Sequence, residues 1–303
     1  LHALPEDIAR YRGKYDGGYG ATRRARHIRQ QKLGLFDSAT VELSAPEARS
    51  SDFRYDYGAT DWAYLDAPGR AREAERMEVY AAMVDRMDQG IGRVLAALEA
   101  TGQADNTVVI FLSDNGGCAS WPTEESEADF EAYNANIPVG DPRGYEFVGK
   151  TWGWVQNAPF RRHKVWVYEG GIATPMIVKW PAKITSGEIT HQPGHVVDFL
   201  PTLLDIAGTG PSADVFEGQS LLPIFHGETR PSPQLGWALF GNYAWREGSL
   251  KLIYNVAQKD WELYDLATDR SENHNIAPAH PTTVDRLKQA WWAWAARCGI
   301  TEL

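Results

Sequence analysis

The sequence predicts an α/β fold, in which helices cover a β-sheet, followed by a small C-terminal α+β unit. Two observations support this prediction. A long helical pattern over residues 71–100 is followed by a short turn, the apolar run 107–112 and a glycine-rich loop, an order typical of covered α/β sheets. Near the C-terminus, three short strand-like runs precede a single helix, which is the order of a small α+β unit.

The composition agrees with a globular protein and excludes several classes. Apolar residues make up 43% and charged residues 23% of the 303 residues, which is ordinary for a globular chain. No apolar run approaches the roughly 18 residues that a membrane helix needs. The formal net charge of −10 is opposite in sign to that of proteins that bind nucleic acid through its phosphates. We therefore expect neither a membrane span nor a nucleic-acid partner.

The cysteine count excludes two kinds of site, and the tryptophan count predicts an aromatic feature. Cys118 and Cys298 provide neither a disulfide framework nor a cysteine-based zinc site. Twelve tryptophans indicate a wide aromatic core or an aromatic cleft.

The chain begins Leu-His-Ala-Leu-Pro, without an initiator methionine, a basic segment or an apolar signal. We therefore expect a fragment or a processed product.

The N-terminal part is predicted to be helical. Residues 5–35 are basic, and we interpret the basic run within 23–32 as a solvated helix face rather than an anion site. In residues 71–100, apolar side chains recur at steps of three and four and form one stripe. The stripe consists of Met77, Tyr80, Val84, Met87, Ile91, Leu95 and Leu98. Such a helix, roughly 45 Å long, would cross a whole sheet, and Gly102 stands where its C-cap belongs.

Two strands and a short helix are predicted in the middle of the chain. The β-branched run 107–112 suits a strand that is buried on both faces, and residues 172–180 suit a second buried strand. The acidic residues 120–149 between them are interpreted as an irregular excursion over the surface. Residues 198–208 suit a short helix that Gly208 ends.

Proline and glycine accumulate over residues 211–233 and mark a domain boundary. We place residues 1–230 in the α/β domain and residues 231–303 in the C-terminal unit. Strand-like runs follow at 237–240, 250–254 and 261–264, and a last helix is predicted over 281–297. One face of that helix holds Leu287, Trp291, Trp294 and Ala295.

Two segments could bind a charged ligand. Residues 113–117 follow the first predicted strand at its carboxyl end, where open α/β sheets place their ligands. The carboxylate of Asp114 beside the amide oxygen of Asn115 suits Ca²⁺ or Mg²⁺, although the same residues also make a good turn. Lys164 follows two arginines and a histidine, which fits either an anion site or a solvated basic turn.

Several further side chains are interpreted as structural or stay unassigned, namely His2, Asp85, Asp88, Cys118 and His163. The aspartates flank the stripe of the long helix and suit surface charges or cap partners. The cysteine has no adjacent cation that would make it a reactive thiolate. His191 and His195 are four residues apart, but the intervening proline and glycine argue against a helical zinc pair.

In order and spacing, a set of motifs resembles the sulfatase family, specifically bacterial arylsulfatases of the formylglycine type. Single members of the set are weak signals, but the ordered set is specific and runs through nearly the whole chain. It consists of Leu4–Asp7, Tyr11–Asp16, Met77–Asp88, Ile91–Val94, Asn106–Thr107, Phe111, Ser113–Gly116, Ala158–Arg161, Lys164, Glu169–Ile172, Asp198, Pro201–Gly208, Lys251–Leu252 and Leu263–Leu266.

The resemblance implies an alkaline-phosphatase-like fold with a mixed sheet, and hydrolysis of a small-molecule sulfate ester. It implies that Asp114 and Asn115 are calcium ligands and that Lys164 contacts the sulfate group. The family's nucleophile is a formylglycine made in a Cys/Ser-x-Pro/Ala-x-Arg signature. This chain lacks the signature: Cys118 begins the run Cys-Ala-Ser-Trp-Pro, with Pro122 at the place of the arginine.

The family's first Asp-Asp calcium pair and its leaving-group histidine are also missing. That histidine would lie just before Leu1, so His2 is not given the role. We therefore expect the C-terminal three-fifths of a sulfatase, inactive alone, with the upstream half as its partner. A phosphate or phosphonate ester hydrolase of the same superfamily and a non-enzymatic binding domain stay open. We expect a soluble protein, with the bacterial cytoplasm and the periplasm both open.

Overall fold

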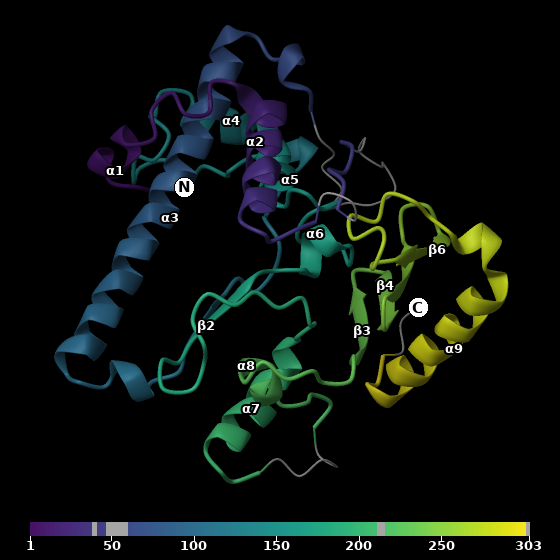
Figure 1. The fold of residues 1–303 in the computed structure, drawn as a ribbon. Coiled ribbons are helices and arrows are strands. Elements are labelled where there is room, and N and C mark those ends of the chain that lie inside the picture. Colours follow the sequence, from purple (N-terminus) through teal and green to yellow (C-terminus); the bar gives the residue numbers. More distant parts are fainter. Residues whose placement is uncertain (38–40, 47–59, 211–215, 301–303) are drawn as a thin grey trace.

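The computed structural model describes residues 1–37, 41–46, 60–210 and 216–300. Figure 1 shows the N-terminal helices beside the upper part of the long helix α3 (Ala67–Ala100), with the short strands β1 (Val109–Leu112) and β2 (Met176–Lys179) below them. A second sheet and the C-terminal helix α9 (Pro281–Arg297) form a separate layer on the opposite side. None of the described helices combines the length and the apolarity that a membrane span requires.

The predicted N-terminal helix is interrupted. It consists of α1 (Pro5–Ala9) and α2 (Gly18–Lys32), and a short 3-10 turn follows at Trp62–Tyr64. Gly18 begins α2 with φ +75°, and a Cβ on it would lie 2.3 Å from the ring of Trp62. The close approach of that ring therefore requires glycine at the start of α2.

The long predicted helix is confirmed as α3 (Ala67–Ala100). Asp66 caps it, because its Oδ1 accepts a hydrogen bond from the Gly69 N–H at 2.8 Å. Burial is concentrated between Ala74 and Ala82. Further along the predicted stripe, Val84 and Met87 are 42% and 48% exposed. The described residues thus cover the first half of the helix and leave apolar residues of its second half open.

The two predicted central strands form an antiparallel pair, β1 (Val109–Leu112) and β2 (Met176–Lys179). In this register Phe111 faces Ile177, and these side chains are 38% and 62% exposed. The prediction that both strands are buried is therefore wrong for the described part of the chain. The second strand starts later than predicted, because Glu169–Ile172 form the short helix α6.

The acidic excursion is also more ordered than predicted. Residues Glu124–Asn134 form α4. After it comes α5 (Lys150–Gln156). The predicted helix near residue 200 is confirmed as α7 (Phe199–Ile206), and α8 (Leu222–Phe225) follows.

The C-terminal sheet is an antiparallel meander in the order β3-β4-β5-β6. Its strands are Gln234–Leu239, Asn242–Glu247, Leu250–Asn255 and Asp260–Asp265. The sequence pattern missed β4, which follows β3 after a two-residue turn at Phe240–Gly241. The last helix is confirmed as α9 (Pro281–Arg297).

This sheet is covered on both faces. On one face Leu252 and Leu263 pack against Leu287 and Trp291 of α9. On the other face β4, β5 and β6 pack against the segment Trp166–Tyr168, which begins two residues after Lys164. The C-terminal sheet therefore contacts the segment in which the sequence predicted a ligand-binding lysine. The domain boundary near residue 230 stays a prediction.

Candidate active site

The carboxyl end of β1 opens into a loop that presents two oxygen donors. The Asp114 side chain is exposed and makes no hydrogen bond or ion pair with the described residues. Asn115 is half-buried, and its Nδ2 donates to the Gly116 backbone oxygen at 2.9 Å. The Asn115 Oδ1 accepts no hydrogen bond from the described residues. Both oxygens are available to a ligand.

The structure brings Lys164 next to this loop. The backbone N–H of Lys164 donates to the Gly117 backbone oxygen at 3.0 Å, and the Lys164 side chain is exposed. Asn157 holds the two segments together. Its Oδ1 accepts from the Gly117 N–H at 2.6 Å, and its Nδ2 donates to the Arg162 backbone oxygen at 3.1 Å. The three residues singled out by sequence thus lie on adjoining loops.

Glycines make this close contact possible. A Cβ on Gly116 would lie 1.8 Å from the Gly170 backbone oxygen. A Cβ on Gly170 or Gly171 would lie within 2.0 Å of the backbone oxygen of Arg161 or Trp166. The Gly-Gly pair of α6 therefore packs directly against the Lys164 loop on one side and the β1 loop on the other.

Behind α6 lies a buried cluster of charges that sequence reasoning missed. Lys251 Nζ lies 2.8 Å from Glu169 Oε1 and 2.7 Å from Glu272 Oε1, and Arg270 Nε lies 2.7 Å from Glu169 Oε2. The sequence carried no clear signal for this cluster, because a lysine between two leucines also fits a strand with one solvated face. The burial of Lys251 shows that its charge must be paired.

Burial and neighbouring charges shift both carboxyl groups. Burial alone would raise the pKa of Glu169, but the charges of Lys251 and Arg270 outweigh it and hold that pKa below the ordinary value. Burial raises the pKa of Glu272 to about 7 in spite of the attraction of Lys251. The Glu169 carboxylate is therefore ionised near neutral pH, whereas Glu272 titrates there.

The basic run of α2 is only partly the solvated face that was predicted. Arg24 and Arg29 are exposed, but Arg23 is 1% exposed. Its guanidinium donates to the backbone oxygens of Pro159 and Phe160 at 3.1 and 3.0 Å and stacks on the ring of Trp154. Arg23 therefore anchors the segment that leads into the Lys164 loop.

His2, His163 and His195 contact backbone atoms. His163 is buried with Nδ1 2.8 Å from the Lys164 backbone oxygen, and His2 Nε2 lies 2.8 Å from the Gly144 oxygen. His195 caps the short helix before α7 through its ring nitrogen. In the described ranges no cluster of three or more His, Cys, Asp or Glu side chains could hold a metal ion, and so no such cluster contains His191 and His195.

The other side chains of chemical interest have structural partners or point outward. Asp85 accepts hydrogen bonds from Arg10, Tyr11 and Gln89 and so ties the N-terminal segment to α3. Asp88 is exposed. The Cys118 Sγ lies 2.9 Å from the Ser120 hydroxyl.

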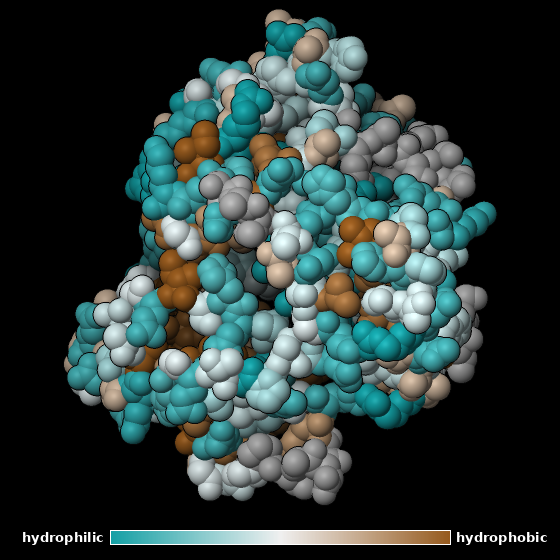
Figure 2. All heavy atoms as spheres, turned by 45° about the vertical axis from the view of Figure 1, so that its right-hand side comes forward, coloured by the Kyte–Doolittle hydropathy of each residue, from teal (hydrophilic) through white to brown (hydrophobic). Residues whose placement is uncertain are grey.

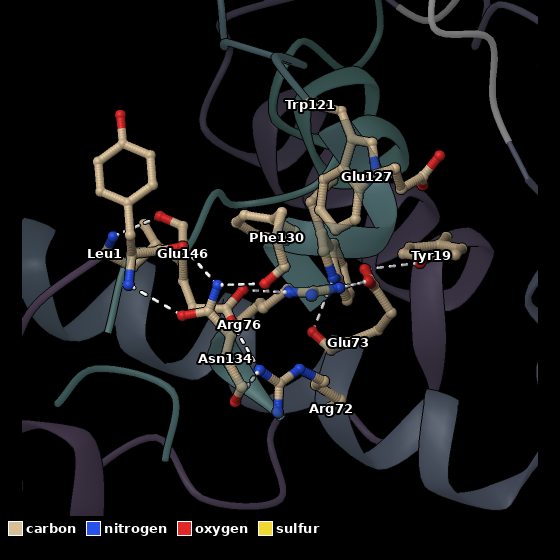
Figure 3. A network of polar contacts seen from close by, with 12 residues as sticks. Leu1, Tyr19, Arg72, Glu73, Arg76, Trp121, Glu127, Phe130, Asn134 and Glu146 are labelled. Carbon is tan, nitrogen blue, oxygen red and sulfur yellow. Dashed lines mark hydrogen bonds and ion pairs between the residues drawn. The ribbon is translucent and has the colours of Figure 1, made fainter. Parts of the chain in front are cut away.

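A polar network near α3 fixes the start of the chain (Figure 3). Leu1 donates from its nitrogen to the Glu146 backbone oxygen at 2.6 Å, and the Glu146 carboxylate pairs with Arg72 and Arg76. The Leu1 side chain packs against a core that includes Trp152 of α5. Asn157 follows α5 directly and contacts the Lys164 loop. The helix α5 therefore contacts the start of the chain at one residue and leads to the Lys164 loop at its end.

Comparisons with known proteins identify the family. The family described as Sulfatase matches residues 1–209, and the family described as N-sulphoglucosamine sulphohydrolase, C-terminal, matches residues 160–292. An uncharacterized sulfatase of Schizosaccharomyces pombe is 31% identical over 99% of this chain and 56% of its own length. An arylsulfatase of Klebsiella aerogenes is 32% identical over 74% of this chain and 47% of its own length. The chain thus spans about half the length of these curated relatives.

A solved structure shares the fold. It was determined in complex with its substrate D-glucosamine-2-N,6-O-disulfate, and it superposes with a TM-score of 0.52 at 24% identity over 77% of this chain and 42% of that one. The Sulfatase family match covers more than half of the chain and includes both loops of the candidate site. This chain belongs to the sulfatase family.

Proposed function

We propose that the protein to which this chain belongs hydrolyses sulfate esters, and that Lys164 binds the sulfate group beside a calcium site that includes Asp114 and Asn115. The observation that supports this proposal most directly is the hydrogen bond from the Lys164 N–H to the Gly117 oxygen. It joins the loop of an exposed lysine, which suits an anion, to a loop whose two free side-chain oxygen ligands suit a hard cation.

The donor atoms fit calcium in kind but not in number. Ca²⁺ takes six to eight oxygen ligands, and this loop offers the Asp114 carboxylate and the Asn115 amide oxygen. The other ligands would come from outside the described residues. When bound, calcium would supply positive charge against the sulfate oxygens.

Lys164 performs the part of the chemistry that this chain can provide. Its ammonium group offers three donors to sulfate oxygens, and its positive charge favours the state in which negative charge develops on the leaving oxygen. Asn157 and the glycines of α6 keep the backbone of this loop in place. The side chain itself is exposed, so a substrate can reach it.

The nucleophile is proposed to be a formylglycine on the upstream half of the enzyme. The Cys118 run does not match the modification signature. Apolar side chains of β1, β2 and α3 stay open in the described structure, among them Phe111, Ile177 and Met87. Figure 2 shows apolar residues gathered in a hollow on one face. These surfaces suit a further layer of the same enzyme, because patches of this kind mark interaction sites.

The test compares Lys164→Ala with Lys183→Ala in the complete enzyme, both positions being exposed lysines. We expect the first variant to lower kcat/KM for 4-nitrophenyl sulfate by at least about 100-fold and the second to leave it unchanged. Unchanged activity of the Lys164 variant would refute its role. Higher kcat/KM for a phosphate or phosphonate ester would favour the related hydrolases, and absence of any turnover a binding domain.

Two further measurements test the remaining parts of the proposal. Asp114→Ala should weaken calcium binding to the complete enzyme, measured by calorimetry, and unchanged affinity would reject the ligand assignment. The 303-residue chain alone should not turn over 4-nitrophenyl sulfate, since it lacks the nucleophile signature. Turnover above background would show that the nucleophile lies within it.

A further inference from the structure

Glu272 holds both ends of the loop that carries Lys164. Its backbone oxygen accepts a hydrogen bond from Arg161 Nη1 at 2.7 Å, and its Oε2 accepts one from the Glu169 N–H at 2.8 Å. Lys164 lies between Arg161 and Glu169 in the sequence. One residue of the C-terminal segment therefore bridges the base of the loop, although it is far along the chain.

Buried charge holds Glu272 in place. The residue is fully buried, and its backbone lies at φ 58°, in the left-handed region, which a residue with a side chain keeps only when its surroundings impose it. Lys251, also fully buried, contacts the carboxylates of both Glu272 and Glu169. Arg270 pairs with Glu169, so Glu169 has two cationic partners and shares one of them, Lys251, with Glu272.

We propose that Glu272 and Lys251 are positioning residues, through which the C-terminal sheet sets where Lys164 lies relative to the loop of Asp114 and Asn115. This inference rests on the proposed role of Lys164 in sulfate binding.

The path from the cluster to the site is short and rigid. Glu169 begins α6, and the backbone oxygen of Gly171 in α6 accepts a hydrogen bond from the Gly116 N–H at 2.9 Å. Gly170 packs against the Arg161 backbone with no space for a Cβ. Because close-packed backbone has no slack, a shift of Glu169 displaces the β1 loop and the Lys164 loop together.

Stability alone gives a weaker explanation of the cluster. A buried ion pair contributes little net stability relative to apolar residues of similar volume. It does impose narrow distances and directions on its members. Glu272 accepts hydrogen bonds from the Lys164 loop with both its backbone oxygen and its carboxylate. The cluster is therefore suited to fixing the position of that loop.

Amide hydrogen exchange on the complete enzyme, without substrate, tests the positioning without any catalysis. The variants are Glu272→Gln and the milder Arg161→Met, and Leu287→Ala on the buried face of α9 is a control that destabilises the C-terminal layer elsewhere. We expect the Lys164 and Gly116 amides to exchange at least about tenfold faster in both variants and at the same rate in the control.

Unchanged exchange at both amides in both variants would overturn the proposal. Equal acceleration by Leu287→Ala would overturn it as well, because the effect would then be general loss of stability. If Glu272→Gln also loses protection throughout β5 and α9, which would mean unfolding, Arg161→Met decides alone.

A double-mutant cycle in the complete enzyme adds a functional readout. Glu272→Gln should lower kcat/KM for 4-nitrophenyl sulfate by up to about 100-fold, the effect of a misplacement near 1 Å. It should have no further effect when Lys164 is alanine. Equal effects in both backgrounds would overturn the positioning role. If Lys164→Ala has no effect by itself, the proposed function fails, and the exchange result still decides on the positioning.

Discussion

Gly116→Ala tests how tightly the two loops of the candidate site are joined. The added Cβ would lie 1.8 Å from the Gly170 backbone oxygen, and real Cβ atoms essentially never come within 3.0 Å of a neighbour. The oxygen would therefore have to retreat by at least about 1.2 Å, the difference between these distances. The backbone of Gly170 packs against the backbone of Arg161, so no side-chain rotation can relieve the overlap.

The expected result follows from that displacement. It is enough to break the 2.9 Å hydrogen bond from the Gly116 N–H to the Gly171 oxygen, and overpacking of this kind costs about 1–3 kcal/mol of unfolding free energy. In the complete enzyme, a shift near 1 Å between Lys164 and the Asp114 loop should lower kcat/KM by about 100-fold.

The assay is urea denaturation of the complete enzyme, with its activity as a second readout. Gly92→Ala is the matched control, because Gly92 lies within α3 and a Cβ there meets nothing within 4 Å. We expect the control to gain about 0.5–1 kcal/mol of unfolding free energy. Equal stability of the Gly116 and Gly92 variants would refute the proposed interlocking of the loops.

Three further predictions concern stability. Trp291→Ala should lose about 3–5 kcal/mol of unfolding free energy in urea, because Trp291 is fully buried and donates to the Trp237 oxygen at 3.0 Å; a loss no larger than that of the adjacent Trp292→Ala, 44% exposed, would contradict this. Lys164→Ala should change the free energy of unfolding by less than about 0.5 kcal/mol, because the side chain is exposed. A larger loss in the same urea titration would show that the Lys164 side chain supports the fold. The pKa of Glu272 is raised to about 7 by burial, so the folded chain binds a proton that the unfolded chain has lost above about pH 4.5; its contribution to unfolding free energy falls as pH rises from about 5 to 7. Glu272→Gln should flatten that slope in titrations at several pH values, and an unchanged slope would contradict the assignment.

The sequence predicted the elements that have a strong local pattern. The stripe from Met77 onward predicted α3, and the apolar face around Trp291 predicted α9, because side chains one turn apart along the chain share a helix face. Helix ends at Gly102 and Gly208 were predicted from glycine, and both have positive φ. The ordered motifs also pointed to the sulfatase family before any contact was known.

Local pattern was misleading where neighbours far along the chain decide. The strands around Phe111 and Ile177 were predicted to be buried, yet burial depends on which layers cover the sheet. Arg23 looked like one of five surface cations, but it reaches backbone oxygens more than a hundred positions away. The strand β4 alternates less clearly than its neighbours, and the sheet around it determines its conformation.

Sequence alone determined the residue types of the candidate site, namely a carboxylate and an amide after a strand and a lysine before a Glu-Gly-Gly run. The tertiary structure decided that these residues lie on adjoining loops, joined through Gly117 and Asn157, and that Glu272 closes the base of the Lys164 loop. The physical reason is that helix and turn preferences act between near neighbours in the chain. Backbone contacts and buried ion pairs between distant segments leave no periodic pattern in the sequence.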